Sequence, residues 1–436
     1  MEYTVTIERM AYSADAVGHL PNGKAVFVEG AAPGDVARVE LTEEKDSFAR
    51  ASLVEIEQYS ESHQEKSAPR DLPDICPWQH LTYEAQLKAK RDNVVGQLVH
   101  TARIAEDEAQ RLVAQTIASK RQWAYRNKLE LSCEVGPDGK FQTGFRREGT
   151  DALVQADSTL LVHKNIQKAP KALRGVIRYI SGSSDLGIYR IGVRNSMATG
   201  ETEVALWTRP GKFPRALAAK ALGQSLKVTS IVRVLADPGH ARKIKGVEIL
   251  DGRGYWRERI GNARFSTQAP SFFQVNTAQA GKLVDEVLAG LGDVEGMYVA
   301  DLYAGGGTFS IPLALAGADV VAVEAAGSSV RDLRFNAQEN GVDIDVVGGD
   351  AARELSSLGS LDALVVDPPR AGLAKNVPAD IAQARPGRVV YVSCNPSTWA
   401  RDVARFVEEG YRLISAKPVD MFPQTYHVEI VSVFAQ

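Results

Sequence analysis

The chain has 436 residues, 44% of them hydrophobic and 24% charged, which indicates a soluble globular protein of two or three domains and excludes a disordered or fibrous chain. No run of about 18 apolar residues occurs, so we expect no membrane-spanning helix. The first residues lack the charged and then apolar pattern of a secretion signal. The three cysteines, Cys76, Cys133 and Cys394, are too far apart to indicate a disulfide framework. We therefore expect a cytoplasmic protein.

The net charge of −3 is unevenly distributed along the chain. Residues 271–436 hold 12 Lys and Arg against 21 Asp and Glu, a net of −9, which leaves 39 against 33, a net of +6, for residues 1–270. A basic front and an acidic back indicate separate tasks, namely binding of a polyanion and catalysis. A difference of this size also arises from solvated surfaces alone.

Residues 1–60 are predicted to form an all-β barrel of the oligonucleotide-binding type. Apolar and polar residues alternate there, as they do in half-buried strands, and turn sequences separate the alternating segments. The clearest predicted strands are Tyr3–Ile7, Ala25–Val28 and Val36–Leu41. Residues 59–75 are polar and contain prolines, which indicates a linker.

Residues 75–270 are predicted to form a middle domain that is helical over residues 78–118 and β-rich afterwards. In the helical part, apolar residues recur at roughly helical spacing. They are Tyr83, Leu87, Val94, Leu98 and Ile104. The predicted strands of the β-rich part are Leu129–Val135, Gly187–Val193, Glu203–Trp207, Ile231–Val234 and Gly246–Ile249.

From residue 271 to 436, strands and helices alternate as in βαβ units, which predicts an α/β domain with a mostly parallel sheet. Residues 297–314 are predicted to be a strand, a glycine turn around Gly305 and a helix. The next strand ends at Glu324, 19 positions after Gly305, where a carboxylate can accept hydrogen bonds from both ribose hydroxyls. Asp350, at the end of the following strand, is a candidate to bind adenine.

This spacing is typical both of NAD-binding folds and of S-adenosylmethionine (SAM) methyltransferases. The glycine run is not Gly-x-Gly-x-x-Gly, which argues against a dinucleotide. A tight turn without any ligand is the remaining interpretation. Residues 361–370 are predicted to be a buried strand that ends in Asp367-Pro-Pro-Arg370. Enzymes that methylate amino groups carry an aromatic residue where Arg370 stands, so the methyl acceptor is expected to be a ring carbon.

Cys394 follows an apolar strand and precedes the turn residues Asn395 and Pro396, so it is expected at the carboxyl edge of the sheet, where α/β proteins bind ligands. Methylation of C5 of uracil needs such a thiol, because only addition of a thiolate to C6 makes C5 nucleophilic. A base must then remove the C5 proton. His427 and Glu429 lie two positions apart on a terminal strand and are both candidates, and a carboxylate is already ionised at neutral pH. For each residue alone, a structural role is at least an equal alternative.

Five motifs occur in order in the last 165 residues. They are Ser-Phe-Phe-Gln274-Val-Asn, Asp301-Leu-Tyr303-x-Gly-x-Gly-Thr-Phe, Asp367-Pro-Pro-Arg-x-Gly, Val-Ser-Cys394-Asn-Pro and Phe-Pro-x-Thr-x-His-Val-Glu429. Together they resemble the RNA 5-methyluridine methyltransferases, which use SAM and have a Rossmann-like catalytic domain. Residues 1–60 resemble the TRAM domain, an RNA-binding barrel that in this family is typical of the 23S ribosomal RNA enzymes.

The resemblance implies that Cys394 is the nucleophile and that Glu429 removes the C5 proton. It also implies that Gln274, Tyr303, Glu324 and Asp367 line the SAM pocket or the uracil site, together with the loop at Gly305. RNA, most simply 23S ribosomal RNA, is the implied partner, and no membrane or obligate protein partner is indicated. Residues 120–128 and 144–147 of the middle domain mix basic and aromatic side chains, as RNA binding requires, although an ordinary solvated strand is an equal alternative.

The sequence departs from the family at two places. Many members hold a [4Fe–4S] cluster through four cysteines, but here only Cys76 remains near that region, and the fourth position falls near Ser158. Since Cys133 lies within a predicted strand, we expect no iron–sulfur cluster and no other metal. Ala304 stands where relatives often carry Cys, in a loop with no required chemistry.

Three alternatives to a 23S ribosomal RNA enzyme remain. The chain could methylate a uridine of transfer RNA. It could methylate C5 of cytosine, although cytosine enzymes of RNA usually pair two cysteines and only Cys394 is near the predicted site. It could also be an RNA-binding assembly factor that has lost catalysis, against which Cys394, Glu429 and the glycine loop argue.

Overall fold

The computed structural model describes residues 1–64, 75–147, 150, 152–182, 184–239 and 243–436, so most of the predicted linker at 59–75 lies outside the described residues. Contacts divide the chain into two compact units. The first unit comprises residues 1–122, 282–302 and 352–436, and the second comprises residues 123–281 and 303–351. The three domains expected from the sequence remain a prediction, because compact units and domains need not coincide.

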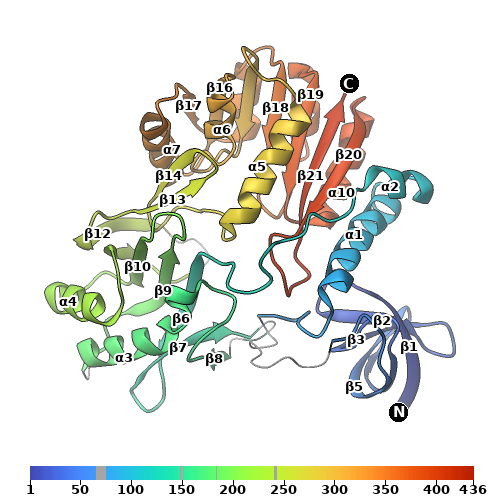
Figure 1. Ribbon diagram of the computed structural model, residues 1–436, viewed down its shortest axis with the longest axis horizontal. Coiled ribbons are helices and arrows are strands. Elements are labelled where there is room, and N and C mark those ends of the chain that lie inside the picture. Colours follow the sequence, from blue (N-terminus) through green and yellow to red (C-terminus); the bar gives the residue numbers. More distant parts are fainter. Residues whose placement is uncertain (65–74, 148–149, 151, 183, 240–242) are drawn as a thin grey trace. The chain divides into compact units, whose positions relative to one another are not determined.

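The N-terminal part of the first unit is a closed five-stranded barrel, as predicted, with strand order β1-β2-β3-β5-β4 (Figure 1). Its core contains Val5, Ile7, Val26, Val28 and Val39, which alternate with solvent-facing residues. The strands are β1 (Glu2–Met10), β2 (Asp15–His19), β3 (Ala25–Glu29), β4 (Val36–Glu44) and β5 (Phe48–Gln58).

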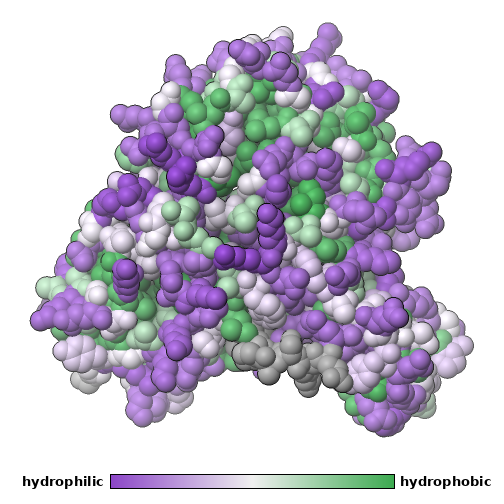
Figure 2. All heavy atoms as spheres, in the orientation of Figure 1, coloured by the Kyte–Doolittle hydropathy of each residue, from purple (hydrophilic) through white to green (hydrophobic). Residues whose placement is uncertain are grey.

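The predicted helix over residues 78–118 is two helices, α1 (Tyr83–His100) and α2 (Glu106–Leu112). Thr82 caps α1, since its hydroxyl accepts a hydrogen bond from Ala85 N at 3.4 Å. Trp78, just before α1, packs in the barrel core and donates its indole N–H to Ser13 O at 2.9 Å. Figure 2 shows a hydrophilic surface over α2, whose first turn is acidic.

The first unit also contains the strands at whose ends Asp367, Cys394 and Glu429 lie. Their order is β15-β18-β19-β21-β20, in which β15, β18 and β19 are parallel and β21 is antiparallel to both of its neighbours. The strands are β15 (Tyr298–Leu302), β18 (Ala363–Val366), β19 (Arg388–Ser393), β20 (Arg412–Val419) and β21 (Glu429–Ala435). Helices α9 (Val377–Ala384) and α10 (Pro396–Glu408) belong to the same unit. Helices α5 (Thr277–Leu291) and α8 (Ala351–Glu354) run from one unit into the other.

The second unit contains the β-rich part of the middle region as a seven-stranded sheet of order β12-β11-β10-β9-β6-β7-β8. The strands are β6 (Lys128–Val135), β7 (Phe141–Arg146), β8 (Leu153–Gln155), β9 (Ile188–Asn195), β10 (Thr202–Thr208), β11 (Ser230–Ala236) and β12 (Ile244–Gly252). Helices α3 (Ala169–Ser181) and α4 (Arg215–Ser225) pack together and against the sheet, and the sequence analysis did not predict them (Figure 1). Leu173, Ile177 and Ile180 of α3 are buried in this core.

The rest of the second unit consists of a hairpin and a βαβ segment. The hairpin is β13 (Trp256–Ile260) and β14 (Ala263–Thr267), and α7 (Gly327–Asn340) contacts β14. Strands β16 (Asp319–Glu324) and β17 (Asp345–Gly348) are parallel, and α6 (Ser310–Leu315) precedes β16. The α/β prediction for residues 271–436 is therefore confirmed, with a sheet that is mixed because of β20 and β21.

Candidate active site

Cys394 lies in the turn between β19 and α10, at the carboxyl end of its strand as predicted. Asn395 caps α10 by accepting a hydrogen bond from Ser397 N at 3.1 Å, and Pro396 occupies the first helical position, where its missing N–H costs little. The same Asn395 side chain donates to Arg370 O at 3.2 Å. The Asn-Pro pair after Cys394 thus fixes the turn and ties it to the Asp367–Arg370 segment.

The segment that begins at Asp367 is held against α10 by a buried carboxylate. Asp402 of α10 is fully buried and accepts hydrogen bonds from Leu373 N at 2.8 Å and from Tyr391 Oη at 3.0 Å. Gly372 has a φ of 74°, and a Cβ there would lie 2.5 Å from Asp402 Oδ2. Glycine is therefore required at this position, which explains the glycine that follows Arg370 in the motif.

Glu429 is the first residue of β21, is buried, and pairs with Val419 of β20. The loop before it is fastened to the N-terminal part of the chain. Gln424, with a φ of 71°, donates its N–H to Gln86 Oε1 at 2.9 Å, and its carbonyl accepts the N–H of Trp78 at 3.0 Å. The side chain of Gln86 in α1 thus holds this loop through a hydrogen bond to the loop backbone.

A buried ion pair lies under the same loop. Lys90 of α1 and Asp420 form a hydrogen-bonded salt bridge between two fully buried side chains. Tyr83 Oη donates to the second oxygen of Asp420 at 2.7 Å, and Lys90 Nζ also donates to Phe422 O at 3.1 Å. Burial lowers the pKa of Lys90, whereas Asp420 opposes this shift. Such a pair fixes geometry more than it adds stability.

Two carboxyl groups and one cation influence the ionisation of Cys394. Burial, with a contribution from Asp301, raises the pKa of Asp367 to about 7. Burial also raises the pKa of Glu429 well above its ordinary value, with Asp367 adding to the shift and Arg370 opposing it. Burial and the charges of Glu429 and Asp367 raise the pKa of Cys394 to about 12, again opposed by Arg370. Glu429 is therefore a candidate base that is electrostatically coupled to the thiol.

The electrostatics correct one step of the sequence argument. Glu429 was favoured as a base because a carboxylate is ionised at neutral pH, but its burial favours the protonated form. Its ionisation depends on Arg370 and on the charge of its neighbours. His427 precedes β21 in the loop, where its ring lies 4.3 Å from the ring of Tyr426 and 5.9 Å from that of Phe422.

We expect the thiol of Cys394 to react slowly at neutral pH because its pKa is raised to about 12. The rate of alkylation by iodoacetamide, followed by peptide mass spectrometry, should keep rising well above pH 9. At high pH, where Glu429 is ionised, Glu429→Gln removes a negative charge near the thiol, lowers the pKa of Cys394 and should therefore speed alkylation. A rate that levels off with a midpoint near the ordinary thiol value of about 8.5 would contradict this electrostatic description.

The sequence analysis missed Tyr12, which lies in the loop between β1 and β2 of the barrel. Its hydroxyl donates a hydrogen bond to Cys394 O at 3.2 Å, and its ring meets that of Tyr426 edge-on at 5.5 Å. Burial raises the pKa of Tyr12, and the charges of Arg370, Cys394 and Glu429 also influence it. No local pattern in the sequence connects these residues, which are 382 positions apart.

The remaining predicted site residues lie in the second unit. Gly305 N donates to Glu324 Oε2 at 2.9 Å, and Ala326 N donates to Glu324 Oε1 at 2.6 Å, so Glu324 shapes the glycine loop. Tyr303 has a φ of 63° in this loop. A Cβ added at Gly305 would meet no atom within 4 Å, which leaves the backbone open to a ligand. The half-buried Glu324 carboxylate and the open loop fit a nucleoside cofactor.

Gln274 and Asp350 differ in their surroundings. Gln274 is buried between β14 and α5, and its carbonyl accepts a hydrogen bond from Asn127 Nδ2 at 2.8 Å. Asp350 is exposed after β17, and the adjacent Gly349 N donates to Glu324 O at 3.1 Å. Tyr303, Gly305, Glu324 and Asp350 therefore lie in one segment of the second unit, residues 303–351. Asp367, Cys394 and Glu429 lie in the first unit.

Among the described residues, no group of three or more His, Cys, Asp or Glu side chains could hold a metal ion. Cys76 and Cys133 are buried and form no disulfide, and burial raises the pKa of Cys133 to about 12. Within the part of the chain that the structure describes, no helix is long and apolar enough to cross a membrane.

Comparison with known proteins identifies the family of the chain. The family description tRNA (Uracil-5-)-methyltransferase matches residues 257–435, and the TRAM domain matches residues 1–54. An RNA methyltransferase of Thermosynechococcus vestitus, described as uncharacterized, is 32% identical over 98% of this chain and 96% of its own. The chain belongs to the RNA (uracil-5-)-methyltransferase family. A second uncharacterized RNA methyltransferase of this kind, from Halalkalibacterium halodurans, is 31% identical over 98% of this chain and 95% of its own.

One solved structure of a uracil methyltransferase is similar to this chain over nearly its whole length. The tRNA (uracil-54, C5)-methyltransferase of Pyrococcus abyssi, in complex with S-adenosyl-L-homocysteine, superposes with a TM-score of 0.77 and 27% identity over 99% of both chains. The chain is a SAM-dependent RNA methyltransferase, with SAM as its cofactor and an RNA-binding TRAM barrel at its N-terminus.

Proposed function

We propose that this enzyme methylates C5 of a uridine in 23S ribosomal RNA through a covalent bond between Cys394 Sγ and C6 of the base. The observation that supports the covalent mechanism is the electrostatic coupling of Cys394 to Glu429, Asp367 and Arg370 at the carboxyl edge of the sheet. A mechanism without a protein nucleophile would give Cys394, which lies at the carboxyl edge of the sheet, no role in catalysis.

The glycine loop around Gly305 and the Glu324 carboxylate are the residues that we propose to hold the cofactor, together with Gln274, Tyr303, Asp350 and Asp367. When bound, SAM supplies an electrophilic methyl group. The protein's own task is to make the C5 of uracil a nucleophile and to restore the ring afterwards.

In the first step, the thiol of Cys394 gives its proton to solvent water, and the thiolate sulfur adds to C6. The electron pair of the C5–C6 bond moves through the ring toward O4, which gives an enolate whose C5 is nucleophilic. Arg370 is a cation whose charge influences Cys394, and we propose that it also stabilises the enolate. The thiolate is disfavoured in the free pocket, so we expect binding of RNA to promote its formation.

In the second step, after C5 has gained its methyl group, the carboxylate of Glu429 takes the proton from C5. The C–H electron pair reforms the C5–C6 double bond, the bond between sulfur and C6 breaks, and Cys394 leaves as a thiolate. The raised pKa of Glu429 makes its carboxylate a stronger base than an exposed one, which suits removal of a proton from carbon.

Two RNAs are candidate substrates. The TRAM barrel, which in this family is typical of ribosomal RNA enzymes, favours 23S ribosomal RNA. A transfer RNA is the second candidate, because the Pyrococcus abyssi enzyme acts on tRNA by its description and covers 99% of this chain, barrel included. The barrel alone therefore does not separate the two substrates.

Mapping of 5-methyluridine by mass spectrometry, in RNA from cells with and without this enzyme, tests the proposal. We expect one or more fragments of 23S ribosomal RNA to lose the modification. Loss confined to transfer RNA would replace the ribosomal substrate by the second candidate. No loss from either RNA would contradict uridine methylation in the cell.

A further inference from the structure

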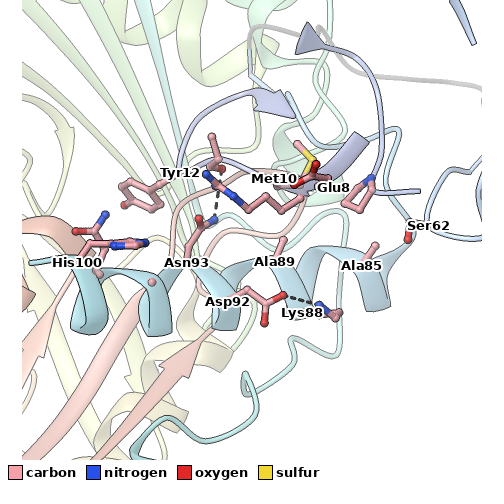
Figure 3. Close-up of a pocket in the computed structure, with 15 residues that line it drawn as sticks. Glu8, Met10, Tyr12, Ser62, Ala85, Lys88, Ala89, Asp92, Asn93 and His100 are labelled. Atoms are coloured by element: carbon pink, nitrogen blue, oxygen red, sulfur yellow. Dashed lines mark hydrogen bonds and ion pairs between the residues drawn. The ribbon is translucent and has the colours of Figure 1, made fainter. Parts of the chain in front are cut away.

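A pocket of about 390 Å³ lies between α1 and the end of β1 in the first unit. Figure 3 shows the labelled residues of α1, from Ala85 to His100, along one side and Glu8, Met10 and Tyr12 of the barrel opposite them. Small residues of α1, namely Ala85, Ala89 and Gly96, recur on the face that lines the pocket. The hollow is thus open because these positions carry almost no side chain.

The pocket presents polar groups that suit a nucleotide. Its two acidic residues have partners: Glu8 lies 2.7 Å from His19 Nδ1, and Asp92 lies 2.5 Å from Lys88 Nζ. The side chain of Arg9 is exposed and makes no hydrogen bond or ion pair with the residues that the structure describes. The side-chain amides of Asn93 and Gln97 line the same space. Asn93 Nδ2 donates to Ala11 O at 3.4 Å and Gln97 Oε1 accepts from Thr101 Oγ1 at 2.9 Å, so Asn93 Oδ1 and Gln97 Nε2 are the atoms that can bind a base edge.

Tyr12 connects the pocket to the candidate nucleophile. It lines the pocket, and its hydroxyl donates to Cys394 O at 3.2 Å. One aromatic side chain therefore separates the pocket from the turn that carries Cys394. If one base of an RNA lies at Cys394, the neighbouring nucleotides of that RNA lie near Tyr12. The ring of Tyr12 is a surface on which a base can stack.

We propose that this pocket binds a nucleotide of the substrate RNA that neighbours the target uridine in the chain. Tyr12 stacks on its base, Asn93 and Gln97 bind the base edge, and Arg9 binds the phosphate. The proposal rests on the proposed function, because it places the target uridine at Cys394. RNA is favoured over a peptide because both walls of the pocket belong to an RNA methyltransferase with a TRAM barrel.

Gly96→Leu tests the pocket by filling it. A Cβ at Gly96 meets no atom within 4 Å, and Leu is a better helix former than Gly, so α1 should fold normally. We expect KM for RNA to rise about tenfold, as loss of one stacked base predicts, with an unchanged affinity for SAM measured by calorimetry. Gly223→Leu is the matched control, because it adds the same side chain without a change of charge to an exposed helical glycine of α4 outside the pocket, and it should leave KM unchanged.

Arg9→Gln tests the same site without filling it. It should weaken RNA binding and reduce the slope of log affinity against log salt by about 1, as expected for one lost phosphate contact. An unchanged KM for RNA in Gly96→Leu together with an unchanged salt slope in Arg9→Gln would overturn the proposal that this pocket binds a nucleotide. The proposed function would survive that result if Cys394→Ala were inactive, and it would fail separately if Cys394→Ala retained full activity.

Discussion

Cys394→Ala should abolish methyl transfer, lowering the rate by a factor on the order of 10⁴ or more, because C5 of uracil is not nucleophilic without addition at C6. The turn around residue 394 should keep its shape, since Asn395 and Pro396 hold it. Transfer of a labelled methyl group from SAM to RNA measures the loss, and calorimetry should show that SAM still binds.

Cys133→Ala is the matched control for this variant. Cys133 is buried in β6, belongs to the second unit and has no proposed part in catalysis, so its removal should leave methyl transfer intact. Full activity in Cys394→Ala would refute the covalent mechanism. Loss of SAM binding in that variant would instead show that the substitution damages the fold.

Glu429→Gln should trap the enzyme on its RNA. The amide keeps the shape of the side chain but cannot take a proton from C5, so addition and methylation proceed whereas release does not. Turnover should fall by about 10²- to 10⁴-fold, as for loss of a general base, and a slowly migrating RNA–protein band should accumulate on a denaturing gel. In the double variant Cys394→Ala, Glu429→Gln the band should be absent.

The adduct separates two roles for Glu429. If Glu429 only supports the fold, Glu429→Gln should lose activity without accumulating the adduct. If His427 were the base, the adduct should accumulate in His427→Ala instead. Normal turnover in Glu429→Gln would therefore contradict its assignment as the base.

Residues with local sequence signals could be placed from the sequence. The Asn-Pro turn marks the end of the strand before Cys394, and the glycine run with Glu324 marks the loop after β15, because strand ends, caps and glycine turns depend on neighbouring residues. The barrel was predictable for the same reason, since its strands alternate clearly. The helix expected over residues 78–118 was only partly right: α1 ends at His100, and Ile104 lies before α2.

Residues whose role depends on distant parts of the chain could not be found in this way. Tyr12 meets Cys394, and Gln86 meets Gln424, only after the barrel and α1 pack against the last strands. The ionisation of Glu429 was misjudged because burial, which sets its pKa, is a property of the folded pocket. Local patterns therefore revealed the reacting groups but not the environment that tunes them.

The buried pair of Lys90 and Asp420 joins residues 330 positions apart, which affects how the enzyme is made. At about 5–20 residues per second, the ribosome adds Asp420 roughly 15 to 65 seconds after Lys90. During this interval the lysine of α1 has no carboxylate with which to form its buried salt bridge, and the loop before Glu429 has not been synthesised. The barrel strands are therefore synthesised before α1, while the catalytic site is completed only after Glu429 has been added. An unfinished chain could bind RNA, but it could not modify it.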